Sequence, residues 1–265
     1  MTKTLAATAV TALALALPMG PASAHFQLVY SPEANIDRPG EIPLELIFWH
    51  PMDAGHAMNM AMPEELFYVF RGERNDLMES VSQTTFRSGE SEATSFEATL
   101  PVRRNGDYIV ALVPAPYYEE AEDIFIQQIT KVFFNKGGLP TGWNEPVGLP
   151  TEIVPMNKPT NVIVGSTFTG QLMAEGEPVA GAEVEIEFMA AEPDVATNSA
   201  GEPSVSDPAG GGIVAVTDAN GVFTFGIPRA GYWGFAALGS GPDKEHEGKE
   251  LSQDAVIWVR AYELD

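Results

Sequence analysis

Apolar and polar residues alternate along short stretches of this chain, which is the pattern of half-buried β-strands. Residues 41–49 place four apolar side chains, from Ile42 to Phe48, on one face of such a strand. Residues 183–188 alternate three glutamates with three apolar residues in the same way. Further strands are predicted at residues 66–70, 106–113, 124–134, 162–173, 213–217, 222–227, 231–238 and 255–262.

Two stretches rich in turn-forming residues separate these strands. Residues 135–159 contain several glycines and prolines and are expected to form a long connection, and residues 192–212 are expected to form a flexible surface loop. The Asn220-Gly221 pair predicts a turn, because both residues accept positive φ at low cost. No segment after residue 24 has the pattern of an amphipathic helix of ordinary length.

Regularly spaced short strands without helices predict an all-β fold of two β-sandwich domains, residues 25–158 and 159–265. The second domain resembles the transthyretin-like or carboxypeptidase-regulatory-like sandwich. Three segments carry this resemblance: Gly176 to Val184, Thr217 to Phe223 and Ala230 to Trp233. The pattern recurs in many extracytoplasmic proteins, so it indicates a fold rather than an activity.

Residues 1–24 have the composition of a secretory signal peptide. Lys3 supplies the positive start, residues 5–17 are apolar and uncharged, and residues 22–24 form a small-residue cleavage site. Cleavage there leaves His25 as the first residue of the mature protein. An N-terminal histidine offers two nitrogen donors, the α-amine and the imidazole, which together can chelate a borderline metal ion. We therefore expect an exported, periplasmic protein whose new N-terminus is a candidate metal ligand.

Composition narrows the possible functions. The chain has 14 Lys and Arg against 37 Asp and Glu, a formal net charge of −23, which disfavours nucleic acid and anionic membranes as partners and attracts cations. No apolar stretch after the leader approaches the ~20 residues of a membrane span, so no direct membrane insertion is expected. The absence of cysteine excludes disulfides, thiol catalysis and Cys-ligated zinc or iron–sulfur sites. A bound metal would be held by His, Met, carboxylate or backbone groups.

All four histidines of the chain are candidate metal ligands. They are His25, His50, His56 and His246. His50 and His56 lie in one segment that directly follows a predicted strand and leads into three methionines, Met58, Met60 and Met62. Imidazole suits Ni, Co, Cu and Zn, whereas thioether favours Cu(I). A single loop histidine is usually solvated and a Met cluster usually fills a core, but together these features predict a metal site.

Several sequence blocks follow one another in a fixed order along the mature chain. They are Ala24-His25-Phe26, Trp49-His50-Pro51, Gly55 to Met60, Pro116 to Glu119, Gly142 to Gly148, Thr151 to Pro155, Gly231 to Leu238 and His246 to Glu250. In these blocks the chain resembles the exported NikK-like nickel/cobalt-uptake accessory proteins, a family of otherwise uncharacterised domains encoded beside energy-coupling-factor-type metal transporters. The resemblance implies that the protein captures Ni(II) or Co(II) as cargo and delivers it to an inner-membrane transporter component. It places His25, His50 and His246 at histidine positions of the family and His56 at a variable one.

The expected mechanism is capture without catalysis. His25 would chelate through its amine and one ring nitrogen, and the other histidines would complete a nitrogen-rich shell that suits Ni(II) or Cu(II). Asp53 or Glu247 could orient a ligand histidine by accepting its second N–H. Because His246 belongs to the second predicted domain, the site is expected between the domains. Ligand histidines must be neutral, so binding should weaken as pH falls through about 6.5.

Three other interpretations remain open. Copper held by an N-terminal histidine site could serve an oxidative, polysaccharide-cleaving enzyme. The methionines would suit a periplasmic copper carrier, and a metal-free structural sandwich pair would need none of these ligands. The usual hydrolase, phosphate-loop and metalloprotease motifs are absent, so we expect no enzyme. The acids at residues 119–123 are interpreted as a solvated face or a docking edge for a partner.

Overall fold

The computed structural model describes residues 25–264. The predicted signal peptide and its cleavage site lie outside the described residues and stay predictions. No helix in residues 25–264 has both the length and the apolar character that a bilayer crossing demands. Helical structure in this range is limited to one 3-10 turn, η1 (Met78–Ser80), as the sequence led us to expect.

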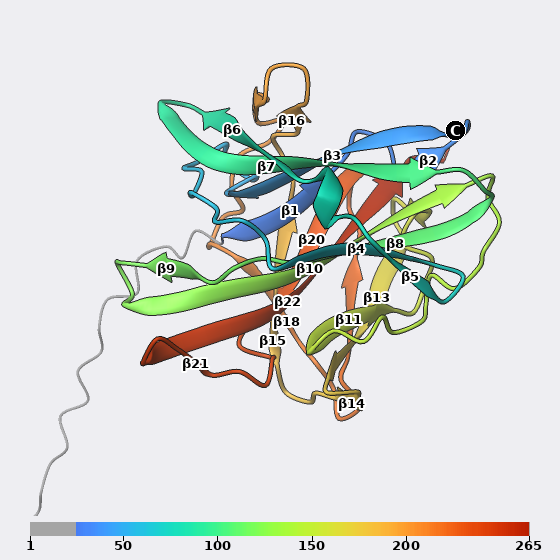
Figure 1. Ribbon diagram of the computed structural model, residues 1–265. Helices are drawn as coiled ribbons and strands as arrows, with labels where there is room; N and C mark the ends of the chain where they lie inside the picture. Colours follow the sequence, from blue (N-terminus) through green and yellow to red (C-terminus); the bar gives the residue numbers. More distant parts are fainter. Residues whose placement is uncertain (1–24, 265) are drawn as a thin grey trace, which may run out of the picture.

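Three β-sheets hold the regular structure (Figure 1). The first, six-stranded sheet has the order β1 (Phe26–Tyr30), β3 (Gly40–Trp49), β7 (Ser91–Val102), β6 (Ser82–Ser88), β17 (Ser199–Ala200) and β16 (Pro193–Asp194). The third, four-stranded sheet contains β11 (Thr151–Pro155), β13 (Thr167–Ala174), β14 (Glu177–Pro178) and β19 (Val222–Gly226).

The second, twelve-stranded sheet is the largest. Its main path runs β18 (Ile213–Val216), β15 (Glu183–Phe188), β20 (Gly231–Ala237), β22 (Lys249–Tyr262), β10 (Ile124–Lys136), β8 (Gly106–Val113), β4 (Glu65–Phe70) and β5 (Glu73–Asp76). Four short strands join this path at its sides: β2 (Asn35–Ile36), β9 (Tyr117–Glu119), β12 (Val162–Ile163) and β21 (Glu245–His246).

The twelve-stranded sheet is the central layer, with a hydrophobic core on each face. On β22, Val256 and Trp258 belong to the core shared with the six-stranded sheet, whereas Ile257 and Val259 belong to the core shared with the four-stranded sheet. Strand β10 divides its side chains in the same way, with Val132 and Phe134 on one side and Phe133 on the other. This alternation follows from the two-residue period of a strand. The all-β sandwich-type fold predicted from the sequence is confirmed.

Strands from both predicted domains meet in the central sheet. Strand β10 lies parallel to β22, in register from Phe125 opposite Leu251 to Lys131 opposite Ile257. Backbone hydrogen bonds within this sheet therefore connect strands from both sides of the predicted domain boundary, which lies between residues 158 and 159. The division into two domains stays a prediction, with the two halves joined through one shared sheet.

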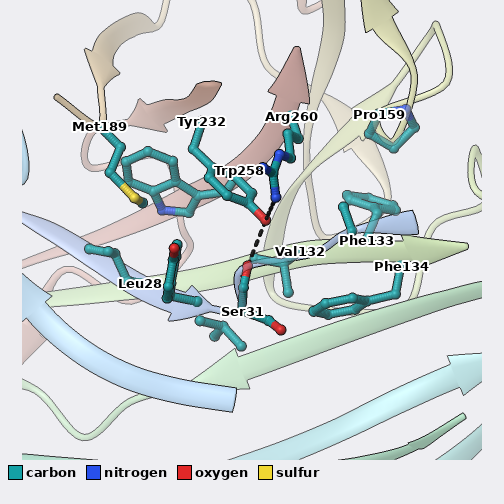
Figure 2. Close-up of a pocket in the computed structure, with 13 residues that line it drawn as sticks. Leu28, Ser31, Val132, Phe133, Phe134, Pro159, Met189, Tyr232, Trp258 and Arg260 are labelled. Atoms are coloured by element: carbon teal, nitrogen blue, oxygen red, sulfur yellow. Dashed lines mark hydrogen bonds between the residues drawn. The ribbon is translucent and has the colours of Figure 1, made fainter. Parts of the chain in front are cut away.

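The first strand is also tied to the second half of the chain. Figure 2 shows the Tyr232 hydroxyl pointing to the backbone oxygen of Ser31, to which it donates a hydrogen bond of 2.6 Å. Arg260 in turn donates to the Tyr232 hydroxyl at 3.3 Å and to the backbone oxygen of Pro32. The cavity between these side chains measures about 10 Å³, so this junction is close-packed. These contacts fix the course of β1, which begins directly after His25.

Candidate metal centre

Pairing between the first and third strands brings His25 beside His50. Strand β1 runs antiparallel to β3, and the last registered pair is Phe26 opposite Trp49. One residue further, the register places His25 opposite His50, and their ring centroids lie 4.5 Å apart. The residues are distant in sequence, so strand pairing rather than a local motif creates this contact.

The central sheet holds the start of β1 in place. The side-chain amide of Gln128 donates to the backbone oxygen of His25 at 2.8 Å, and its oxygen accepts the backbone N–H of Gln27 at 2.8 Å. The Trp258 indole donates to the backbone oxygen of Gln27 at 3.0 Å. All of these groups except His25 are buried, so residues of the central sheet position the backbone at the predicted mature N-terminus.

The segment after His50 forms a tight turn over the end of β3. The backbone N–H of Gly55 donates to the His50 oxygen at 3.1 Å, and the indole N–H of buried Trp49 donates to the Gly55 oxygen at 3.0 Å. The backbone N–H of Met58 then donates a hydrogen bond of 2.9 Å to the Phe48 oxygen. His50 is 8% exposed, so the residue at the start of this turn is buried.

Glu119 places a carboxylate beside this pair. Its Oε2 lies 3.3 Å from Nε2 of His25, and the two side chains are 15% and 23% exposed. Burial and the nearby His50 lower the pKa of the His25 imidazole to about 4, whereas Glu119 acts in the opposite direction. The His25 ring is therefore neutral at pH 6.5, where an unperturbed histidine is half protonated. A neutral imidazole is the form that binds a metal ion.

His56 lies at the exposed rim of the same region. The electrostatic effect of His56 is the smallest of the four that act on the pKa of His25, and it lowers that pKa. His56 therefore lies near the pair. Within residues 25–264, no three His, Asp or Glu side chains are arranged so that they alone could hold a metal ion. Of the four candidate histidines, the structure thus brings the rings of His25 and His50 into direct contact.

His246 lies apart from this pair. Its ring packs edge-on against Phe125, with centroids 4.7 Å apart. On β10, Gln128 faces the six-stranded sheet together with β1, so odd-numbered Phe125 faces the opposite side of the central sheet. The structure therefore does not bring His246 beside the His25–His50 pair. Glu247, expected as an orienting carboxylate, lies 4.0 Å from His246 on this other face.

The three methionines after His56 separate into two environments. Met58 and Met60 are buried in the core between the sheets, at 2% and 8% exposure. The side-chain amide of Gln27 also donates to the Met60 sulfur at 3.6 Å. Met62 is 53% exposed. Core packing therefore accounts for two of the three thioethers on which the copper-carrier interpretation rested.

The sequence predicts that Glu119 belongs to a solvated face or a docking edge, whereas the structure places its carboxylate 3.3 Å from Nε2 of His25 and leaves the side chain 15% exposed. Strand β9 pairs with the start of β10, with Glu119 opposite Ile124, and this pairing turns its carboxylate toward His25. Its neighbour Tyr117 packs its ring edge-on against Phe48 on the same side. The available signal was its position at the end of the Pro116-to-Glu119 block.

Comparison with solved structures gave matches of low similarity. The D0–D1 domain of intimin is 13% identical with a TM-score of 0.21, and the match covers 86% of this chain and 95% of that one. The major pilin subunit BcpA of Bacillus cereus, in a D312A form, is 11% identical with a TM-score of 0.18, covering 91% and 68%. Likenesses at this level carry no argument about function.

Comparison with sequences was more specific. No curated protein matched significantly. A family model described as a domain of unknown function, DUF4198, matches residues 22–241, which include His25, His50 and Glu119 but not His246. Because this match spans most of the chain, the protein belongs to the DUF4198 family.

Proposed function

We propose that the processed protein captures Ni(II) or Co(II) in the periplasm and delivers the ion to an energy-coupling-factor-type transporter in the inner membrane. The observation that carries this proposal is the contact between the His25 and His50 rings, 4.5 Å apart at the predicted mature N-terminus. The resemblance to NikK-like proteins supplies the cargo and the membrane partner. Membership in a family of unknown function is compatible with that narrower assignment.

The chemistry of His25 supports a chelate at the new N-terminus. Cleavage before His25 would turn its backbone nitrogen into a free amine. With Nε2 directed at Glu119, Nδ1 is left to act as the metal donor, and Nδ1 and the amine of one residue close a single chelate ring. His50 would add a third nitrogen from the facing strand. Nitrogen donors in a square-planar or tetragonal arrangement suit Ni(II).

The decisive experiment compares proteins that differ only at the N-terminus. A chain beginning at His25 and a chain with one glycine added before His25 are titrated with Ni(II), Co(II), Cu(II) and Zn(II) by calorimetry. One-to-one binding of Ni(II) or Co(II) that is lost in the extended chain supports the amine–imidazole chelate. Equal binding by both chains contradicts it, and absence of binding in both contradicts the metal-capture function.

Two controls accompany this titration. His25→Ala should abolish binding by the authentic chain, because it removes the ring while leaving a free amine. Thermal denaturation with and without Ni(II) gives a second readout, since a ligand that binds only the native state raises Tm. A Tm indifferent to all four metals would instead favour the structural, metal-free interpretation.

A further inference from the structure

A cavity of about 420 Å³ adjoins the histidine pair. It lies between the β9–β10 hairpin, which contributes Tyr117 and Ile126, and the segment after His56, which contributes Asn59 and Met60. Its volume falls within the range of small-molecule sites in proteins, roughly 300–1,000 Å³. The proposed capture of a metal ion does not by itself account for a space of this size.

Two residues connect the cavity to His25. Phe48 lines it, and the Phe48 ring contacts the His25 ring at 5.6 Å and the Tyr117 ring at 5.3 Å. Gln128 also lines it and donates a hydrogen bond to the backbone oxygen of His25. Neither histidine lines the cavity itself, so an occupant would reach the proposed chelate past Phe48 and Gln128, which both contact His25.

The lining determines which ligand chemistry fits. Phe48 and Tyr117 offer aromatic surfaces and Met60 a thioether, which pack well against another aromatic ring. Among the residues that line this cavity, none is a lysine or arginine, and Glu120 is the carboxylate. Together with the net charge of −23, this lining disfavours polycarboxylates and favours a neutral or cationic occupant.

The proposed chelate would also leave a coordination position open. His25 and His50 supply three nitrogen donors after cleavage, and no group of three His, Asp or Glu side chains in residues 25–264 could hold the ion alone. A tetragonal shell needs at least one donor more. We propose that the cavity binds a nitrogen heterocycle of the imidazole class, which completes the shell, so that the ion is captured as a mixed complex. This inference rests on the proposed function.

Imidazole itself is the probe that tests this inference. Ni(II) is titrated into the chain beginning at His25 with and without millimolar imidazole, and the known competition of imidazole for free Ni(II) is subtracted. A ternary complex should raise the corrected Ni(II) affinity by about fivefold or more, the lower range of coupling between two sites. Citrate, a polycarboxylate, should only compete for the ion.

Variants that fill the cavity test whether the imidazole enhancement depends on the cavity or arises from coordination of imidazole to Ni(II) in solution. Ala115→Trp and Ala61→Trp each place a large ring at its lining, whereas Ala196→Trp, at an exposed position on the β16–β17 connection, is the matched control. Both filled variants should bind Ni(II) alone like the parent and lose the imidazole enhancement. The control should keep the enhancement.

The outcomes distinguish the two proposals. Ni(II) binding that imidazole does not enhance overturns the cavity proposal and leaves metal capture standing. Enhancement that persists in both filled variants overturns it as well, because the imidazole would then bind outside the cavity. Absence of Ni(II) binding under all conditions overturns metal capture and the cavity proposal with it.

Discussion

Nε2 of His25 lies 3.3 Å from Oε2 of Glu119, so a carboxylate from strand β9 faces the ring nitrogen that the proposed chelate does not use. An acceptor at that distance fixes the orientation of the ring and favours the tautomer with Nδ1 free for a metal ion. The pair is largely buried, at 23% and 15% exposure, so solvent screens the interaction only in part.

Glu119→Gln is therefore expected to weaken Ni(II) binding about 10- to 100-fold, the usual cost of changing a residue that orients a metal ligand. Calorimetric titration of the chain beginning at His25 measures this change. Glu122→Gln removes an exposed carboxylate from the same hairpin and should leave the affinity unchanged. Equal affinities for the Glu119 variant and the parent would contradict the orienting role.

The two faces of the central sheet give His50 and His246 different predicted roles. His50→Ala should lower Ni(II) affinity by more than about a hundredfold, beyond the loss that outer-shell changes cause. His246→Ala should leave the affinity unchanged, because its ring packs against Phe125 on the opposite face. The same titration checks both variants. A comparable loss in the two would mean that His246 reaches the bound ion.

Lys131 and Glu152 form a buried ion pair, with Nζ 2.6 Å from Oε2 and side-chain exposures of 1% and 4%. Glu152 also accepts the backbone N–H groups of Val147 and Gly148. Lys131→Met should destabilise the protein by about 3–5 kcal/mol, because it leaves the carboxylate buried without its cation.

The companion substitution tests that explanation of the Lys131 effect. Adding Glu152→Gln removes the orphaned charge and keeps an oxygen for the two backbone donors, so the double variant should recover most of the lost stability. Urea denaturation measures the free energy of unfolding of the parent and both variants. A double variant as unstable as Lys131→Met would show that packing, rather than charge, is lost.

Glu187 gives the protein a pH-dependent stability. Burial raises the pKa of its carboxyl group to about 8, against the effect of the Met52 backbone N–H that donates to it. Between about pH 4.5 and 8 the folded protein holds a proton that the unfolded chain releases. Its free energy of unfolding should therefore fall as pH rises through this window.

Thermal denaturation from pH 5 to pH 8 checks this dependence. Glu187→Gln keeps an acceptor for the Met52 N–H and removes the titration, so it should reduce the fall in Tm. Glu183→Gln, on the same strand but exposed, should keep the slope of the parent. An unaltered slope in the Glu187 variant would assign the dependence to Glu45 and Asp254, whose pKa values burial raises to about 7 and about 6.

Local pattern by itself determined most of the strands. The predicted segments 106–113 and 183–188 coincide with β8 and β15, and residues 41–49 differ from β3 by one residue. Apolar alternation is a local property that strand pairing reinforces. The strand β11 (Thr151–Pro155) lay unrecognised inside a predicted connection, because the flanking glycines and prolines obscured a short apolar run.

The tertiary structure decided which strands became neighbours. The predicted turn at Asn220-Gly221 forms, with Gly221 at φ 72°, but it links β18 in the central sheet to β19 in the four-stranded sheet. The parallel pairing of β10 with β22 joins residues more than a hundred positions apart, and no local signal encodes it.

The candidate site likewise depends in part on the sequence and in part on the tertiary structure. From residue type alone, the sequence identifies three of the candidate ligands. They are His25 at the predicted cleavage site, and His50 and His56 in a Met-rich segment. Strand register brought the first two together, hairpin pairing added Glu119, and the two-residue period of β10 set His246 on the far face. Composition determines which ligands a chain possesses, whereas distances between remote residues arise only when the sheets pair and pack.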